Sequence, residues 1–236
     1  MRRLAIFCEG MTEVVFVERL INEIAEKKKV VIEKKRIRGG GKDGKVARSF
    51  RTIEATQQVV DQRLYVLLVD CGGDSLVKTR IREEHSNLHN AGYEKVIGLR
   101  DVRPDFKKED LKKLQIGLSY GISTKLVPIV FVLSVLEIEA WFLAEYNHFA
   151  AIDPAITADR ITALLGFDPR IDDVADREEP ARDIELCYQL GGKTYTKADV
   201  TSTVDALDFG FLYLKLAERI PQLKLLTDNL DAFMTA

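Results

Sequence analysis

The stretch Leu64-Tyr65-Val66-Leu67-Leu68-Val69-Asp70 decides the fold class. It is apolar until it ends at Asp70, which is typical of a strand in the middle of a parallel sheet that is covered on both faces. Similar short apolar runs lie before and after it in the chain. They alternate with segments whose apolar residues recur at helical spacing, so the chain is predicted to be an α/β protein.

The alternation continues outward from this strand. Strands are predicted at residues 4–8, 30–37, 64–69, 95–99 and 127–136, and helices after Gly10 and at residues 46–62, 76–90 and 107–118. Since no hairpin signal separates paired runs, we expect a doubly wound, mostly parallel sheet with right-handed crossovers. Val204, Leu207, Phe211 and Leu214 recur at helical spacing, so residues 151–236 are predicted to form a helical C-terminal appendage on a domain of residues 1–150.

Composition limits the class of protein. The 236 residues are 46% hydrophobic and 31% charged, as in a globular chain, and the formal net charge of −2 requires any nucleic-acid binding to use a local patch. The longest apolar stretch, residues 126–136, contains Pro128 and is too short to span a membrane, and no secretory signal is expected. Three cysteines without a CxxC pair are typical of buried, reduced thiols, so we expect a cytoplasmic protein.

Acidic residues follow three of the predicted strands. Because the carboxyl ends of parallel strands meet at one edge of a sheet, we expect these side chains to lie close together. Clustered carboxylates repel one another unless cations bind, and hard ions such as Mg²⁺ or Mn²⁺ take oxygen ligands. The alternative is that the acids are only helix N-caps and first-turn residues. The pairs are Glu9 with Glu13, Asp70 with Asp74, and Glu137 with Glu139.

Three motifs around these acids resemble those of TOPRIM nucleases, a family that includes overcoming-lysogenization-defect (OLD) nucleases and RloB-like proteins. Glu9-Gly10-Met11-Thr12-Glu13 is similar to the first motif, and Asp70-Cys71-Gly72-Gly73-Asp74 to the second, which is normally Asp-x-Asp. Glu137-Ile138-Glu139-Ala140-Trp141 resembles a Glu-x-Trp segment after the last core strand. The resemblance covers about residues 4–148 and departs from the pattern at Gly72, where the second acid is expected.

The resemblance implies a TOPRIM-like, Rossmann-like domain that cleaves phosphodiester bonds of DNA or RNA with Mg²⁺ or Mn²⁺. Glu9, Glu13, Asp70 and Glu139 would be catalytic, and the metal ligands would come from Glu9, Glu13, Asp70 and three further acids. Those acids are Asp74, Glu137 and Asp101, and Asp101 is an alternative to the second acid of Asp-x-Asp. The resemblance also implies a role in phage defence beside a separately encoded ATPase. Assembly of the protein into a homo-oligomer is a further possibility.

A glycine-rich basic segment, residues 38–45, follows the second predicted strand. Glycines let backbone N–H groups approach an anion, and basic side chains in and after the segment add positive charge. We therefore predict that it binds a nucleic-acid backbone, with an ordinary solvated loop as the alternative. The predicted contacts are Lys42, Lys45, Arg48 and Arg51.

Two other functions remain open at this stage. A TOPRIM-like module that binds nucleic acid or a protein without cleaving it is favoured by the absence of an acid at position 72. A phosphatase or phosphotransferase with Asp70 as nucleophile requires a hydrophobic-Asp-x-Asp run and a downstream lysine, for which Lys78 is the candidate.

Overall fold

A computed structural model describes residues 1–25, 30–39, 49–55, 63–73, 76–102, 106–135, 137–173 and 177–235. It divides into two compact units, which are described separately. The first unit contains residues 1–100, 112–133 and 230–236, and the second contains residues 101–111 and 134–229.

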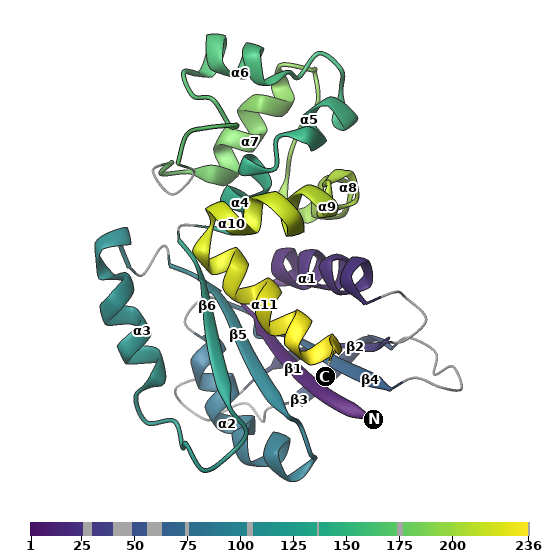
Figure 1. Ribbon diagram of the computed structural model, residues 1–236, viewed down its shortest axis with the longest axis vertical. Helices are drawn as coiled ribbons and strands as arrows, with labels where there is room; N and C mark the ends of the chain where they lie inside the picture. The colour runs from purple at the N-terminus through teal and green to yellow at the C-terminus, as the bar shows by residue number, and fades with distance from the viewer. Residues whose placement is uncertain are drawn as a thin grey trace. The chain divides into compact units, whose positions relative to one another are not determined.

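The first unit is built on a six-stranded sheet in the order β3-β2-β4-β1-β5-β6 (Figure 1). Among the strands that the structure describes, only β3 runs antiparallel to its neighbour. β1 pairs in parallel with β4 and β5, and β2 pairs in parallel with β4. Val96 N donates to Pro128 O and Val102 N to Ser134 O, so β6 also runs parallel to β5. The strands are β1 (Arg2–Cys8), β2 (Val30–Arg38), β3 (Ser49–Ala55), β4 (Leu64–Asp70), β5 (Lys95–Asp101) and β6 (Ile129–Ser134).

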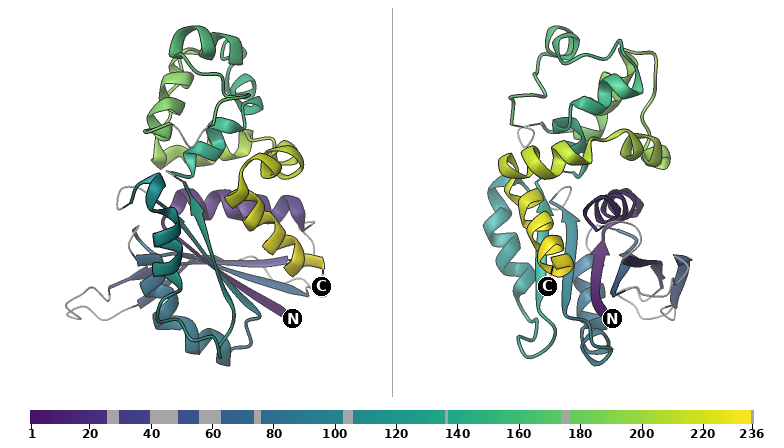
Figure 2. Two further views of the ribbon diagram at one scale, coloured as in Figure 1. Left: turned by 60° about the vertical axis from the view of Figure 1, so that its left-hand side comes forward. Right: turned by 45° about the vertical axis from the view of Figure 1, so that its right-hand side comes forward.

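Helices cover both faces of the sheet, as the apolar pattern of the central strands predicts. Alternate residues of β1 and β4, including Phe7 and Val69, pack with Val77 and Ile81 of α2 (Leu76–Asn90). On the other face, α1 (Met11–Ile24) contacts β1, β2 and β4 and buries Phe16, Val17, Leu20 and Ile21. Residues 112–119 of α3 (Leu111–Ser119) also belong to the first unit, and a short 3-10 helix at Lys108–Asp110 precedes α3 in the chain. The fold is therefore α/β and fits a doubly wound arrangement, and Figure 2 gives two further views of the sheet.

The prediction of a helix at residues 46–62 is wrong. Residues 49–55 form β3, an antiparallel strand at the edge of the sheet, and residues 56–62 lie outside the part that the structure describes. Phe50 and Ile53 have helical spacing, but Ser49–Ala55 also carries the aromatic and β-branched residues that strands favour. Hydrogen bonding to β2 stabilises the strand conformation of this segment over the helical one. The register of the pair shifts between Lys34 and Lys35, which is typical of a β-bulge.

The second unit is helical, as predicted for most of the C-terminal part. Within it, α4 and α6 pack against α7, and α5 contacts both α7 and α8. The predicted stripe from Val204 to Leu214 is interrupted after α8, and Leu214 is exposed. Its elements are α4 (Glu139–Ala144), α5 (Asn147–Ile152), α6 (Ala158–Leu165), α7 (Pro180–Gln189), a 3-10 helix (Lys197–Asp199), α8 (Val200–Ala206), α9 (Phe209–Phe211), a π-helical stretch (Leu212–Leu216), α10 (Ala217–Arg219) and most of α11 (Pro221–Thr235).

The two compact units divide the chain differently from the predicted boundary at residue 150. Residues 134–150 group with the later helices, whereas the end of α11 groups with the sheet. There, Arg2 donates from Nη1 to Phe233 O at 2.7 Å, and its guanidinium lies 5.1 Å from the centre of the Phe233 ring. Whether residues 1–150 and 151–236 fold as separate domains stays a prediction.

In the part of the chain that the structure describes, no helix has the length and apolar character that crossing a membrane requires.

Gly98 in β5 allows α2 to pack closely on the sheet. A Cβ atom at this position would lie 2.8 Å from side-chain carbons of Ile81 and Phe131. We expect Gly98→Ala to lower the free energy of unfolding by about 1–3 kcal/mol, because it overpacks the core.

Gly117 in α3 is the matched control, because a Cβ atom there would have no heavy atom within 4 Å. Gly117→Ala should raise the free energy of unfolding by about 0.5–1 kcal/mol, the helix preference of alanine over glycine. Urea denaturation of both variants measures the difference, and equal midpoints would show that Gly98 is not tightly packed.

Candidate functional site

The turn between β1 and α1 fixes the first pair of acids. Glu9 and Gly10 separate the strand from the helix, and both Glu9 and Glu13 are buried, with 9% and 4% of their surface exposed. Gly10 N donates to Glu13 Oε2 at 2.8 Å. One oxygen of Glu13 therefore binds the start of α1, as the helix-capping alternative predicts, and this contact fixes the position of its carboxylate.

The turn after β4 is joined to Glu9 by backbone hydrogen bonds. Cys71 N donates to Cys8 O at 2.9 Å, and Gly73 N donates to Glu9 O at 3.0 Å. Asp70 is in register with Cys8, is 2% exposed, and accepts a hydrogen bond from Gly72 N at 2.9 Å through Oδ1. The structure therefore brings Glu9, Glu13 and Asp70 to the carboxyl edge of two adjacent strands.

The same turn explains why glycine stands where Asp-x-Asp has its second acid. Gly72 has a φ of 78° and Gly73 a φ of 146°, both in the region that side chains with a Cβ rarely adopt. An aspartate at position 72 would be strained in this conformation. The conformation instead lets the Gly72 N–H approach Asp70, so the turn orients the Asp70 carboxylate and does not supply a second one.

A row of charged side chains crosses the sheet from Asp70 to its edge. Arg36 of β2 is in register with Asp70, and its Nε donates to Asp70 Oδ2. Arg51 of β3 lies directly opposite Arg36 in the antiparallel pair and is exposed. Partners directly opposite in a sheet point to the same face. Arg36 and Arg51 therefore lie side by side next to a buried carboxylate.

A third arginine lies near the same edge. Arg80 of α2 is 3% exposed and donates from Nη2 to Gly39 O at 2.6 Å, just beyond the end of β2. Its Nη1 also donates to Glu83 at 3.1 Å. The charge of Arg80 acts to lower the pKa of Cys71, which places it close to the turn after β4.

The cysteines beside the acids are unsuited to nucleophilic catalysis. Burial, together with Glu13, Cys71 and Asp70, raises the pKa of Cys8, and burial with Asp70, Glu9 and Glu13 raises that of Cys71. Both thiols therefore stay protonated, whereas the thiolate is the reactive form. Since Asp70, Glu9 and Glu13 all act on the Cys71 thiol, the three carboxylates occupy one small region.

The other predicted acids that the structure describes belong to the second unit. Asp101 is 5% exposed and accepts a hydrogen bond from the Ser134 hydroxyl. Glu139 is fully buried, accepts from the Tyr195 hydroxyl at 3.0 Å and lies 3.5 Å from Lys197 Nζ. Lys197 Nζ is also 3.7 Å from Glu137. Glu137 and Glu139 thus share one lysine.

Tyr195 and Lys197 were not predicted from the sequence. Burial and the Glu139 carboxylate raise the pKa of Tyr195, so its hydroxyl stays protonated and donates. In the part of the chain that the structure describes, Glu139 Oε2 has no hydrogen-bond partner. No local sequence pattern predicts these contacts, because Glu139 and Tyr195 are far apart in the sequence.

Several predicted residues lie outside the described part of the chain. They are the acid Asp74 and the basic residues Lys42, Lys45 and Arg48. Arg51 is described, but in a strand and not in the helix that was expected.

The donor chemistry of Glu9, Glu13 and Asp70 fits a hard divalent cation, since all three present carboxylate oxygens. Their arrangement fits less well. Glu13 binds Gly10 N, Asp70 binds Arg36, and within the described ranges no group of three or more His, Cys, Asp or Glu side chains is arranged to hold a metal. The predicted Mg²⁺ or Mn²⁺ site therefore stays a prediction.

Comparison with known proteins gives no match, either to a model of a protein family or to a curated protein.

The raised thiol pKa values lead to a labelling prediction. All three cysteines are free and buried, and burial raises the pKa of Cys187 to about 12. A thiol reagent such as DTNB should react with none of them in the folded protein at about pH 8, and with all three after denaturation.

The same pKa shifts give the sign of a pH effect on stability. The pKa of each thiol is higher in the folded protein than in the unfolded chain, where it is about 8.5. Below that pH the thiols are protonated in both states. As the pH rises above it, the unfolded chain loses thiol protons that the folded protein keeps, and the unfolded state becomes more favourable. The free energy of unfolding should therefore fall above that pH, as denaturation at a series of pH values would measure. Rapid labelling of the folded protein would contradict the burial of Cys8 and Cys71.

Proposed function

We propose that this protein is a divalent-metal-dependent nuclease that hydrolyses phosphodiester bonds of DNA or RNA. The observation that carries the proposal is the gathering of three buried carboxylates, Glu9, Glu13 and Asp70, at the carboxyl edge of adjacent strands. Ligand sites of open α/β sheets lie outside this edge. The pairing of β1 with β4 also brings together the first two of the three motifs on which the resemblance to TOPRIM nucleases rests.

The arginines beside the acids favour an anionic substrate. Arg36 and Arg51 lie directly opposite each other, and like charges in that arrangement destabilise a sheet. A phosphate that accepts hydrogen bonds from both guanidinium groups would offset their repulsion, and arginine is well suited to such contacts. The net charge of −2 gives no general attraction for nucleic acid, so a local group of this kind is needed.

Within this proposal, Glu9 and Asp70 would hold the ion. A divalent ion bound there would polarise the phosphate and lower the pKa of a bound water. The protein's own contribution is positioning: Gly72 N holds Asp70 Oδ1, Gly10 N holds Glu13, and Arg36 and Arg51 hold the phosphate. Binding of the ion to Asp70 Oδ2 would require Arg36 to move from this oxygen to the phosphate.

The cellular location, biological role and partner of the nuclease are also proposals. A cytoplasmic enzyme of phage defence that works with a separately encoded ATPase follows from the resemblance alone. It adds no residue to the site.

A non-catalytic module that binds nucleic acid through the same edge is the second candidate. It is favoured by the Arg36–Asp70 pair and by the lack of a three-residue metal group within the described ranges. The phosphatase alternative has less support, because Lys78 donates to Gly117 O and Gly72 replaces the acid of its motif.

Cleavage of labelled single- and double-stranded DNA and RNA with Mg²⁺ or Mn²⁺ tests the nuclease. Glu9→Gln and Asp70→Asn should each lower the rate on the order of 10²-fold or more, the usual effect of losing a catalytic acid or base. Asp205→Asn, a change at an exposed site on α8, is the control and should leave the rate unchanged. No cleavage together with no metal-dependent rise in melting temperature would overturn the nuclease in favour of the binding module.

The contribution of Arg51 is tested by binding alone. Arg51→Met should weaken binding of a labelled oligonucleotide and reduce the slope of log affinity against log salt by about one, because one phosphate contact is lost. Fluorescence anisotropy over a range of salt concentrations measures both effects. Arg182→Met, at an exposed position on α7, is the matched control, and equal slopes for the two variants would exclude Arg51 from the contact.

A further inference from the structure

One outer edge of the sheet is formed by β6, and none of the described strands pairs with its free side. Backbone hydrogen bonds from β5 reach Pro128 O and Ser134 O. The main-chain groups of a strand point alternately to its two sides, so these even-numbered residues face β5. The N–H and C=O groups of Ile129 and Phe131 therefore point away from the sheet, where a further strand can pair.

The two outer strands of the sheet differ in how they oppose association. Unpaired strand edges associate with other strands unless charged residues, bulges or a covering element prevent it. β3 carries Arg51 and Glu54, and its pairing with β2 includes a register shift. β6 reads Ile-Val-Phe-Val-Leu-Ser, without a charged residue or proline, and its first three residues are only partly buried. β6 thus has the properties of an edge that a partner covers.

A cavity of about 470 Å³ adjoins the first half of β6. It is lined by the end of α3, by the loop that returns from α3 to β6, and by Ile129 and Phe131 of the strand (Figure 1). Ile122 and Leu126 of the loop add apolar, partly exposed surface. Every second side chain of a strand points to the same face, so a strand added beside β6 would present alternate side chains to this cavity.

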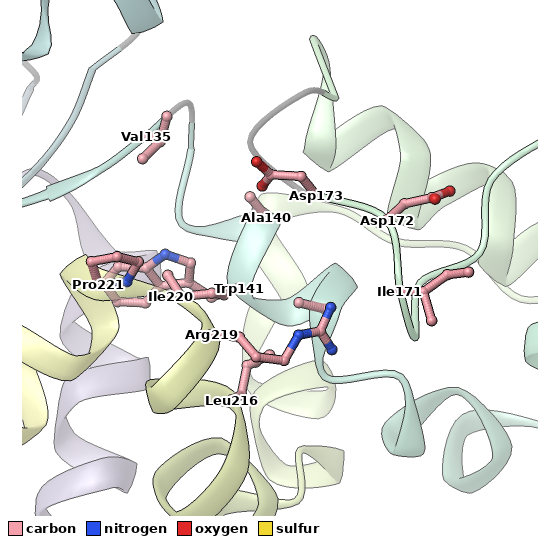
Figure 3. A pocket seen from close by; sticks show the side chains of 11 residues that line it. Val135, Ala140, Trp141, Ile171, Asp172, Asp173, Leu216, Arg219, Ile220 and Pro221 are labelled. Atoms are coloured by element: carbon pink, nitrogen blue, oxygen red, sulfur yellow. The ribbon is translucent and has the colours of Figure 1, made fainter.

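The second unit has a cavity of similar volume, about 420 Å³, but its wall is different (Figure 3). Trp141, Ala144 and Leu216 line it, and each is only 1% exposed. Arg219, also in its lining, donates to Arg170 O at 2.7 Å. That wall is packed within its own unit, whereas most residues that line the cavity beside β6 are partly or fully exposed and accessible to an incoming chain.

Helix α2 packs against the segment that ends α3 and returns to β6. Lys78 donates to Gly117 O, and His85 Nε2 lies 2.7 Å from Val127 O. Arg82 follows Lys78 by four residues and precedes His85 by three, so it lies on the same face of α2, where it is exposed. Two basic side chains of α2 therefore border this segment.

The charges around the cavity have one sign. Lys125 is exposed and lies between two residues that line the cavity. Burial and the positive charge of Arg82 lower the pKa of Lys78, so these two side chains repel each other. Residues 111–134 contain three lysines and no acidic residue. An acidic partner would be attracted to this region, and a basic one would be repelled.

Two large side chains extend the apolar surface at the end of α3. Tyr120 N donates to Ile116 O at 3.1 Å, so the two residues lie one turn apart, and they are 81% and 73% exposed. Tyr120 follows Ser119, which lines the cavity. Exposed apolar groups of this kind mark protein-binding surfaces, in which tyrosine is enriched.

From these features we propose that β6 binds a partner protein through an extended acidic segment, which adds to the sheet as a further strand. The segment presents apolar side chains to the cavity and acidic residues to Lys78, Arg82 and Lys125. Hydrogen bonds to the main chain of Ile129 and Phe131 require an extended peptide backbone. β6 itself contains no acid, so a second copy that pairs through β6 alone would bring none to the basic residues.

A synthetic peptide with blocked ends tests the inference. Its centre alternates valine and threonine over six residues, the length of β6, and glutamates flank both ends. Binding to the full chain, without metal, is followed by fluorescence anisotropy of a label on the peptide. We expect saturable binding, at least about tenfold tighter at low salt than that of the same peptide flanked by lysines. No binding, or equal binding of both peptides, would overturn the inference.

Methylation of the peptide's backbone nitrogens tests for strand addition. An added strand directs the N–H groups of alternate residues to β6 and the others to solvent. Methylation of either the valine set or the threonine set should therefore abolish binding, and methylation of the other set should leave the affinity unchanged. Binding that tolerates both changes would show that no strand is added.

Charge reversal on the protein locates the site. Lys125→Glu should weaken binding of the glutamate-flanked peptide roughly fivefold at low salt, because attraction is replaced by repulsion. Lys215→Glu, at an exposed position in the second unit, is the matched control and should leave the affinity unchanged. Equal melting temperatures would show that both variants fold. Equal affinities of the two variants would place the peptide elsewhere and overturn the inference.

Other occupants of this edge give different results. If the protein dimerises with rising concentration and the peptide does not dissociate the dimer, β6 pairs with a second copy and the inference is overturned. A labelled oligonucleotide that binds less tightly to Lys125→Glu, with no peptide binding, would assign the surface to nucleic acid instead. Absence of cleavage in the nuclease assay leaves the inference intact, because the peptide assay uses no metal and no residue of the acidic site.

Discussion

The hydrogen bonding of β1 to β4 is the constraint on which the rest of the site depends. These strands lie far apart in the sequence, yet their register sets Cys8 beside Asp70, and the next bonds join Glu9 to the turn after β4. Helices on both faces of the sheet bury the two strands. This pairing brings Glu9 and Asp70 together, whereas Glu13 is positioned locally by its contact with Gly10 N.

Acids in this protein are balanced by its own donors. Arg36 pairs with Asp70, the Ser134 hydroxyl binds Asp101, and Lys197 lies near both Glu137 and Glu139. Burial of an uncompensated carboxylate would be costly, so these partners let the fold form without an added ion. An incoming cation must compete with them, so its affinity depends on how easily Arg36 can leave Asp70.

The sequence predicts the parts of the fold that depend on local pattern. Apolar runs such as Leu64–Asp70 identify the central strands, and helical spacing identifies α1, α2 and α3. It does not predict β3, because Phe50 and Ile53 fit either a helix or a strand until β2 is known to lie beside them. Nor does it predict the Arg36–Arg51 neighbours or the contact of Tyr195 with Glu139, since register and long-range contacts leave no local signal.

The position of β1 also has consequences for the order of folding. It precedes both of its partners in the sequence, because β4 and β5 follow residue 63. Contacts of such sequence separation form slowly, and a strand without its neighbours exposes unpaired edges. We therefore expect nascent β1 to remain unpaired until Leu64–Asp70 has been synthesised, and its edge toward β5 to stay open until Lys95–Asp101 follows, so a chaperone that covers this strand would protect it during synthesis.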